Sequence, residues 1–80
     1  MLKIKILGGG CANCKKLEEL TREVVRTMEV EAEFEKVTDP QQIQQYPILS
    51  TPALVINETV ASSGRIPAKT EIARWIGAAL

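Results

Sequence analysis

The chain has 80 residues, of which 45% are hydrophobic and 25% charged, and its ten Lys and Arg balance ten Asp and Glu. These proportions are ordinary for a small globular protein and exclude a disordered tail, a collagen-like fibre and a disulfide-dense scaffold. A neutral chain with one Trp, one Tyr and one Phe lacks the basic field and stacking surface of a nucleic-acid binder. The absence of His excludes Cys-His catalysis and His-ligated metal.

The first half of the chain predicts a strand, a long helix and a second strand. Hydrophobic residues alternate with lysines over residues 2–7, which is typical of a strand, and the glycines at 8–10 end it. From residue 11 to 28 hydrophobic residues recur at three- and four-residue steps, which predicts an amphipathic helix. The alternation over residues 30–35 predicts a strand with one buried face and one acidic face, as expected at a sheet edge.

The second half predicts a short helix, a hairpin and a last helix. The Thr-Asp-Pro sequence at 38–40 is a helix-start signal. The unbroken hydrophobic run 53–56 predicts a buried central strand, and the Asn-Glu pair after it predicts a tight turn into a strand over residues 59–62. Pro67 is expected to open the last helix, although no Ser, Thr, Asn or Asp stands at its cap position.

The order strand, helix, strand, short helix, strand, strand, helix predicts an α/β fold. A strand–helix–strand unit implies a parallel pair, and the last two strands imply a hairpin. A four-stranded mixed sheet with helices on both faces satisfies both conditions. With no internal repeat and no linker, residues 1–80 are expected to form a single domain.

No hydrophobic stretch is long enough to span a membrane, and the first residues lack the continuous apolar middle of a signal peptide. We therefore expect a cytoplasmic protein without a membrane partner. In a reducing compartment two neighbouring cysteines indicate redox chemistry or metal binding.

Cys11 and Cys14 form a Cys-x-x-Cys motif directly after a strand and at the start of a helix. This spacing brings two sulfurs within reach of a disulfide, at a Cα separation of roughly 5.5 Å. The helix start supplies free N–H groups that stabilise a thiolate. Helical phase turns Cys11 outward and Cys14 toward the core, so we expect Cys11 to attack and Cys14 to resolve.

Metal binding is the alternative for this pair. Zinc prefers four ligands, whereas two thiolates alone suit a soft ion such as monovalent copper. Copper-carrier domains of similar length also place Cys-x-x-Cys after a first strand. They order their elements differently, and they usually carry Met where Gly10 stands. The pattern favours a redox pair with no resident metal or other cofactor besides the Cys11–Cys14 disulfide, and a soft-metal carrier remains the alternative.

Two neighbouring features are candidate contributors to the site. Lys15 lies one helical turn after Cys11 and is a candidate for lowering the pKa of its thiol, the alternative being a solvated lysine. Thr51-Pro52 directly precedes a buried strand. It is either an ordinary trans start of that strand or a cis peptide bond whose turn presents backbone groups beside the cysteines.

The segment 10–14, Tyr46 and the segments 50–56 and 64–67 together resemble the small thioredoxin/glutaredoxin-like redox-active disulfide proteins of archaea and bacteria. The resemblance extends over essentially the whole chain. It implies a thioredoxin fold, thiol–disulfide exchange by a nucleophilic Cys11 and a resolving Cys14, and a cis Pro52 packed against them. We expect disulfide-bearing protein clients and an upstream thiol reductase as partners, and a monomer.

The sequence also departs from its relatives. Ordinary thioredoxins carry a buried Asp six residues before the first cysteine, where this chain has Lys5. We expect Lys5 to be a solvated strand lysine, the alternative being a residue near the site. The residue that accepts the proton of Cys14 is therefore not identified. Glutaredoxins bind glutathione with Gly-Gly and an acidic residue. At the corresponding position, residues 62–65, this chain has Ser-Ser-Gly-Arg, so glutathione binding is not expected. Tyr46 and Trp75 are expected to be core or rim aromatics.

Overall fold

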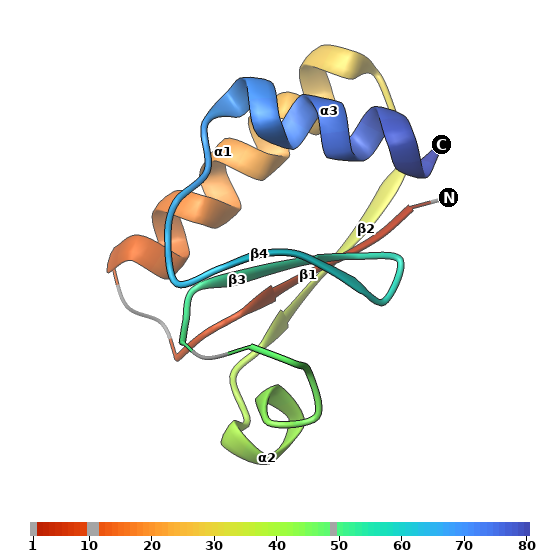
Figure 1. Cartoon of the computed structure of the whole chain (residues 1–80). Helices are drawn as coiled ribbons and strands as arrows, with labels where there is room; N and C mark the ends of the chain where they lie inside the picture. The colour runs from red at the N-terminus through yellow and green to blue at the C-terminus, as the bar shows by residue number, and fades with distance from the viewer. Residues whose placement is uncertain (1, 10–11, 49) are drawn as a thin grey trace.

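The computed structural model describes residues 2–9, 12–48 and 50–80. Its elements follow the predicted order, which is thereby confirmed (Figure 1). None of the helices in these ranges is long and apolar enough to cross a membrane. The elements are β1 (Leu2–Leu7), α1 (Ala12–Met28), β2 (Ala32–Val37), α2 (Pro40–Ile43), β3 (Ala53–Ile56), β4 (Thr59–Ser63) and α3 (Lys69–Ala79).

The strands form one mixed sheet in the order β2-β1-β3-β4. β1 runs parallel to β2 and antiparallel to β3, and β3 and β4 form an antiparallel hairpin. In this register Ile4 of β1 lies beside Phe34 on one side and Ile56 on the other. The two central strands are those with the most continuous hydrophobic burial, as the sequence pattern predicts.

Helices cover both faces of the sheet, so the predicted α/β architecture is confirmed. α1 and α3 lie together on one face and the short α2 lies on the other (Figure 1). The alternation within β1 divides its side chains between two hydrophobic clusters. Ile4 and Ile6 pack in the cluster under α1 and α3, whereas Leu7 packs with Val37 and Val55 in the cluster beside α2.

β2 begins at Ala32, two residues later than predicted, because the residues before it close the end of α1. The N–H of Val30 donates to the carbonyl of Val25, and the N–H of Glu29 donates to that of Arg26. This is the Schellman pattern, in which the residue after the helix takes a left-handed conformation; Glu29 has φ 55°. Val30 is thereby used to close the helix, so pairing with β1 begins at Ala32.

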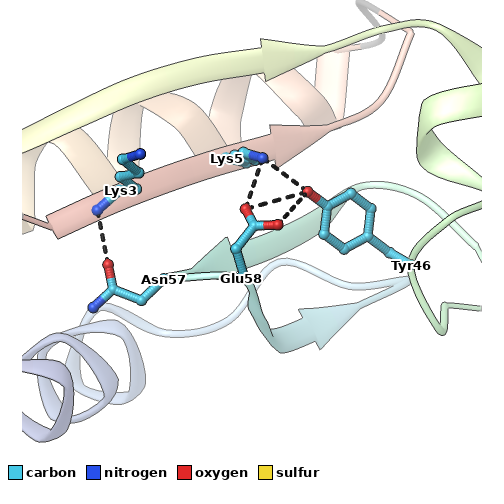
Figure 2. Close-up of polar contacts among 5 residues, drawn as sticks. All are labelled: Lys3, Lys5, Tyr46, Asn57 and Glu58. Carbon is cyan, nitrogen blue, oxygen red and sulfur yellow. Dashed lines mark hydrogen bonds and ion pairs between the residues drawn. The ribbon is translucent and has the colours of Figure 1, made fainter.

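The hairpin turn between β3 and β4 forms at the predicted Asn57-Glu58 pair. Both residues have positive φ, 50° and 65°, which is the geometry of a type I′ turn. The Asn57 side chain accepts a hydrogen bond from the N–H of Lys3 at 2.9 Å (Figure 2). The backbone N–H of Asn57 in turn donates to the Lys3 carbonyl at 2.8 Å. Asn57 therefore also ties the turn to the start of β1.

α3 begins at Lys69, two residues after the predicted Pro67. The cap position holds Ala68, whose side chain cannot accept a hydrogen bond. Glu71 compensates, because its carboxylate accepts the N–H of Ala68 at 3.1 Å and pairs with Arg65 at 2.9 Å. An acidic residue one turn into the helix thus holds its start.

We expect this carboxylate to make folding stability depend on acid pH. Two hydrogen bonds, of which that from Arg65 has a larger effect than that from Ala68, lower the pKa of Glu71 to about 2. Its stabilisation is complete above the unfolded pKa of about 4.3 and is lost as pH falls toward 2. Urea unfolding at pH steps between these values should give a flatter stability profile for Glu71→Gln than for the parent. Glu19→Gln, an exposed change on α1, should keep the parent's slope, and an equally steep Glu71→Gln profile would contradict the assignment.

Candidate functional site

Cys14 lies in the first turn of α1 with only 5% of its surface exposed, so its predicted lean toward the core is confirmed. The helix start supplies N–H groups and the positive end of the helix dipole near this sulfur. Cys11 lies outside the described residues, and its predicted exposure and its pairing with Cys14 remain predictions.

Three segments converge on the Cys14 sulfur. A Cβ atom added to Gly8, just after β1, would overlap Cys14 Sγ and would lie 3.8 Å from the Cβ of Thr51. The N–H of Gly8 donates to the Val37 carbonyl at 3.0 Å, which fixes this glycine against the end of β2. The structure therefore brings two of the predicted site residues, Cys14 and Thr51, to the same place, and only a residue without a side chain fits between them.

Thr51 and Pro52 lead into the central strand β3. Thr51 is exposed and Pro52 is buried, and the peptide bond between them is cis. The Pro52 carbonyl accepts the N–H of Gly64 at 2.9 Å, so the end of β4 anchors this turn. An exposed residue thus stands beside Cys14 on an anchored turn, which is the arrangement needed for contact with an incoming chain; that role for Thr51 and Pro52 remains a prediction.

A small cavity of about 50 Å³ adjoins Cys14. Cys14, Lys15 and Glu18 line it from the first two turns of α1. The volume exceeds the roughly 10–15 Å³ that one water needs, and the lining includes side chains that hydrogen-bond water, among them Glu18 and Lys36. The rest of the lining comes from the ends of the two parallel strands: Ile6, Gly8, Lys36 and Thr38.

Glu18 contributes a carboxylate to the lining of this cavity. Its carboxylate pairs with Lys36 Nζ at 3.0 Å and with Arg22 Nε at 3.0 Å, and 14% of its side chain is exposed. Burial by itself would raise the pKa of Glu18, but the hydrogen bonds from Lys36 and Arg22 outweigh it and lower the pKa. The carboxyl group is therefore ionised at neutral pH. Its partner Lys36 comes from β2 and could not be inferred from helical spacing.

Lys15 is exposed and lines the same cavity. It follows Cys14 directly and contributes positive charge to the surroundings of the site. Its predicted influence on the Cys11 thiol concerns a residue outside the described ranges, so that influence remains a prediction.

The expectation that Lys5 is a solvated lysine is wrong. Only 22% of its side chain is exposed, because Glu58 and Tyr46 close over it, with Nζ 2.7 Å from the Glu58 carboxylate and 3.0 Å from the Tyr46 hydroxyl (Figure 2). Both hydrogen bonds raise the pKa of Lys5 well above its usual range, and the bond to Glu58 has the larger effect. Because neighbouring strand residues point to opposite faces, Lys5 points away from the face on which Ile6 lines the Cys14 cavity.

Trp75 lies at the rim of a separate hollow of about 420 Å³ between the hairpin and α3, with Ile56 and Val60 among its other lining residues. Trp75 and Tyr46 are both half-buried and pack against the two hydrophobic clusters, so their prediction as core or rim aromatics is confirmed. This hollow shares no lining residue with the cavity at Cys14.

The chain is similar to known proteins over nearly its full length. The sequence profile of the thioredoxin domain matches residues 2–77. A thioredoxin of Methanothermobacter thermautotrophicus is 40% identical over 72 residues, which cover 90% of this chain and 94% of that protein. A thioredoxin of Methanocaldococcus jannaschii is 32% identical over 72 residues, which cover 90% of this chain and 83% of that protein. The profile match includes every segment that meets at Cys14.

Proposed function

Since the chain belongs to the thioredoxin family and is a disulfide oxidoreductase, we propose that Cys11 and Cys14 are its redox-active pair and that protein disulfides are its substrates. The observation that carries the proposal is the position of Cys14. It is buried in the first turn of α1, against Gly8 and beside the exposed Thr51. A shielded thiol at a helix start, three residues after a second cysteine, is suited to resolving a mixed disulfide.

The proposed reaction has two exchange steps. The Cys11 thiolate attacks one sulfur of a client disulfide, so that a Cys11–client bond forms and the client's other sulfur leaves as a thiolate. The Cys14 sulfur, after losing its proton, then attacks Cys11 Sγ and displaces the client's remaining sulfur as a thiolate. The client gains two electrons, the protein ends with a Cys11–Cys14 disulfide, and an upstream thiol reductase returns it to the dithiol.

Thr51 and Pro52 would position the client. Thr51 is exposed next to Cys14, and Pro52 has no N–H with which to pair to a neighbouring strand. A client segment that adds to this turn as a short strand would place its disulfide against the cysteines. Lys15 would favour the Cys11 thiolate by its charge. We propose that a monomer performs this cycle in the cytoplasm, where thiol reductases are present.

The test compares disulfide exchange with metal binding. The reduced protein should accelerate the reduction of insulin by a dithiol, and a variant with both cysteines changed to Ser should leave only the uncatalysed rate. In glutathione redox buffers, alkylation and mass spectrometry should show both cysteines oxidising together, because intramolecular closure outcompetes a stable mixed disulfide. Tight one-to-one binding of monovalent copper without reduction of any offered disulfide would instead establish the soft-metal carrier.

A further inference from the structure

The resolving step requires a base near Cys14. A free cysteine has a pKa of about 8.5, so most thiols of this kind still carry their proton at neutral pH. Cys14 is 5% exposed, with Gly8 packed against its sulfur. Hydroxide and buffer bases therefore have poor access to its proton, and Lys5, which occupies the place of the acidic residue of ordinary thioredoxins, points to the other face of the sheet.

Glu18 is placed to serve as that base. It lies four residues after Cys14 on α1, and side chains at this spacing are neighbours on one face of a helix. Both residues line the cavity of about 50 Å³, which has room for a water. The ion pair with Lys36 holds the Glu18 carboxylate at the cavity wall, at 3.0 Å from Nζ.

We propose that the Glu18 carboxylate accepts the proton of the Cys14 thiol, through a water in the cavity that both side chains line. The proposal rests on the proposed exchange reaction of Cys11 and Cys14. The S–H bond of Cys14 breaks and its electron pair forms the bond to Cys11 Sγ. The proton passes by way of the water to a Glu18 oxygen, and from there to solvent through the exposed edge of that side chain.

The charges around the cavity suit such a relay. The hydrogen bonds from Lys36 and Arg22 keep the Glu18 carboxylate ionised, so it can accept a proton at neutral pH, and Lys15 adds positive charge at the same cavity. A carboxylate whose pKa is low is a weaker base than one matched to the thiol, but it is a far stronger base than water. It also releases the proton quickly rather than holding it, which leaves the site ready for the next cycle.

The test uses 5,5′-dithiobis(2-nitrobenzoate), mixed one-to-one with the reduced full chain. Attack by Cys11 releases a first thionitrobenzoate, and attack by Cys14 on the mixed disulfide releases a second, so the absorbance shows the two steps separately. Glu18→Gln should leave the first phase unchanged and slow the second at least tenfold, within the range of general-base effects. The difference in second-phase rate between Glu18→Gln and the parent should decrease as pH rises, because hydroxide then removes the proton of Cys14. Glu18→Asp, which keeps a carboxylate, should restore part of the rate.

Two further variants separate proton transfer from a structural role. Glu23 also lies on α1 and pairs with a lysine, Lys69, at 2.9 Å, but it does not line the cavity, so Glu23→Gln should match the parent. Lys36→Met breaks the ion pair and leaves the carboxylate, so it should slow the second phase much less than Glu18→Gln. If Lys36→Met slowed the second phase as much as Glu18→Gln, the effect would come from loss of the ion pair and not from proton transfer, which would contradict the proposal. An unchanged or faster second phase in Glu18→Gln would also overturn it. A parent that releases no first thionitrobenzoate, or a Cys14→Ser protein that still releases the second, would instead refute the proposed exchange reaction.

Discussion

Replacing Cys14 by Ser is expected to trap the protein as a mixed disulfide with its client, whereas replacing Cys11 by Ser should leave no adduct. Without the Cys14 thiol the second exchange has no attacking group, so the first product accumulates. Without Cys11 the remaining thiol is the buried one, 5% exposed and packed against Gly8, which a client disulfide reaches poorly. Both variants should reduce insulin at no more than the uncatalysed rate.

Incubation of each variant with cell extract, followed by non-reducing electrophoresis and mass spectrometry, would measure these adducts. Asn13→Ser is the matched control, because it introduces the same side chain at an exposed position of the motif and removes no thiol. It should turn over like the parent and accumulate no adduct. Recovery of adducts from Cys11→Ser alone would reverse the roles of the two cysteines.

The fold was predictable where a residue's neighbours in sequence determine its surroundings. Alternation over β1, the continuous hydrophobic run of β3 and the Asn57-Glu58 turn each specify a local geometry, and the structure confirms all three. Element ends were less predictable, because they depend on backbone hydrogen bonds that a pattern does not reveal. The closing bond of Val30 at the end of α1 and the hydrogen bond from Ala68 to Glu71 at the start of α3 are both of this kind.

The polar surroundings of the site were the least predictable part. Glu18 and Lys36 meet only because β2 runs parallel to β1 beside the start of α1, and 41 positions separate Lys5 from Tyr46. An isolated lysine in a strand is usually solvated, so its enclosure by Glu58 and Tyr46 required knowledge of the tertiary structure. The position of Cys14, in contrast, followed from helical phase, since the start of its helix was already given by the glycines before it.

Gly8→Ala is expected to damage both stability and exchange, although it adds one methyl group. The new Cβ would overlap Cys14 Sγ and approach Cys14 Cβ to 3.4 Å. Relief requires that the end of β1 or the start of α1 move, and overpacking of this kind costs about 1–3 kcal/mol. That is a large part of the roughly 4–12 kcal/mol expected for a chain of this length. Urea unfolding at neutral pH would measure the loss.

The next glycine supplies the control. A Cβ on Gly9 would meet no atom of the described residues within 4 Å, so Gly9→Ala adds the same methyl group in the same loop without a clash against this part of the chain. It should keep the parent's stability or gain slightly, since alanine restricts the unfolded chain more than glycine does. A displaced Cys14 would also change the angle from which its sulfur attacks. We therefore expect a slower second thionitrobenzoate release for Gly8→Ala and not for Gly9→Ala. If the two variants behaved alike in both measurements, the close packing of Gly8 against Cys14 would not constrain the site.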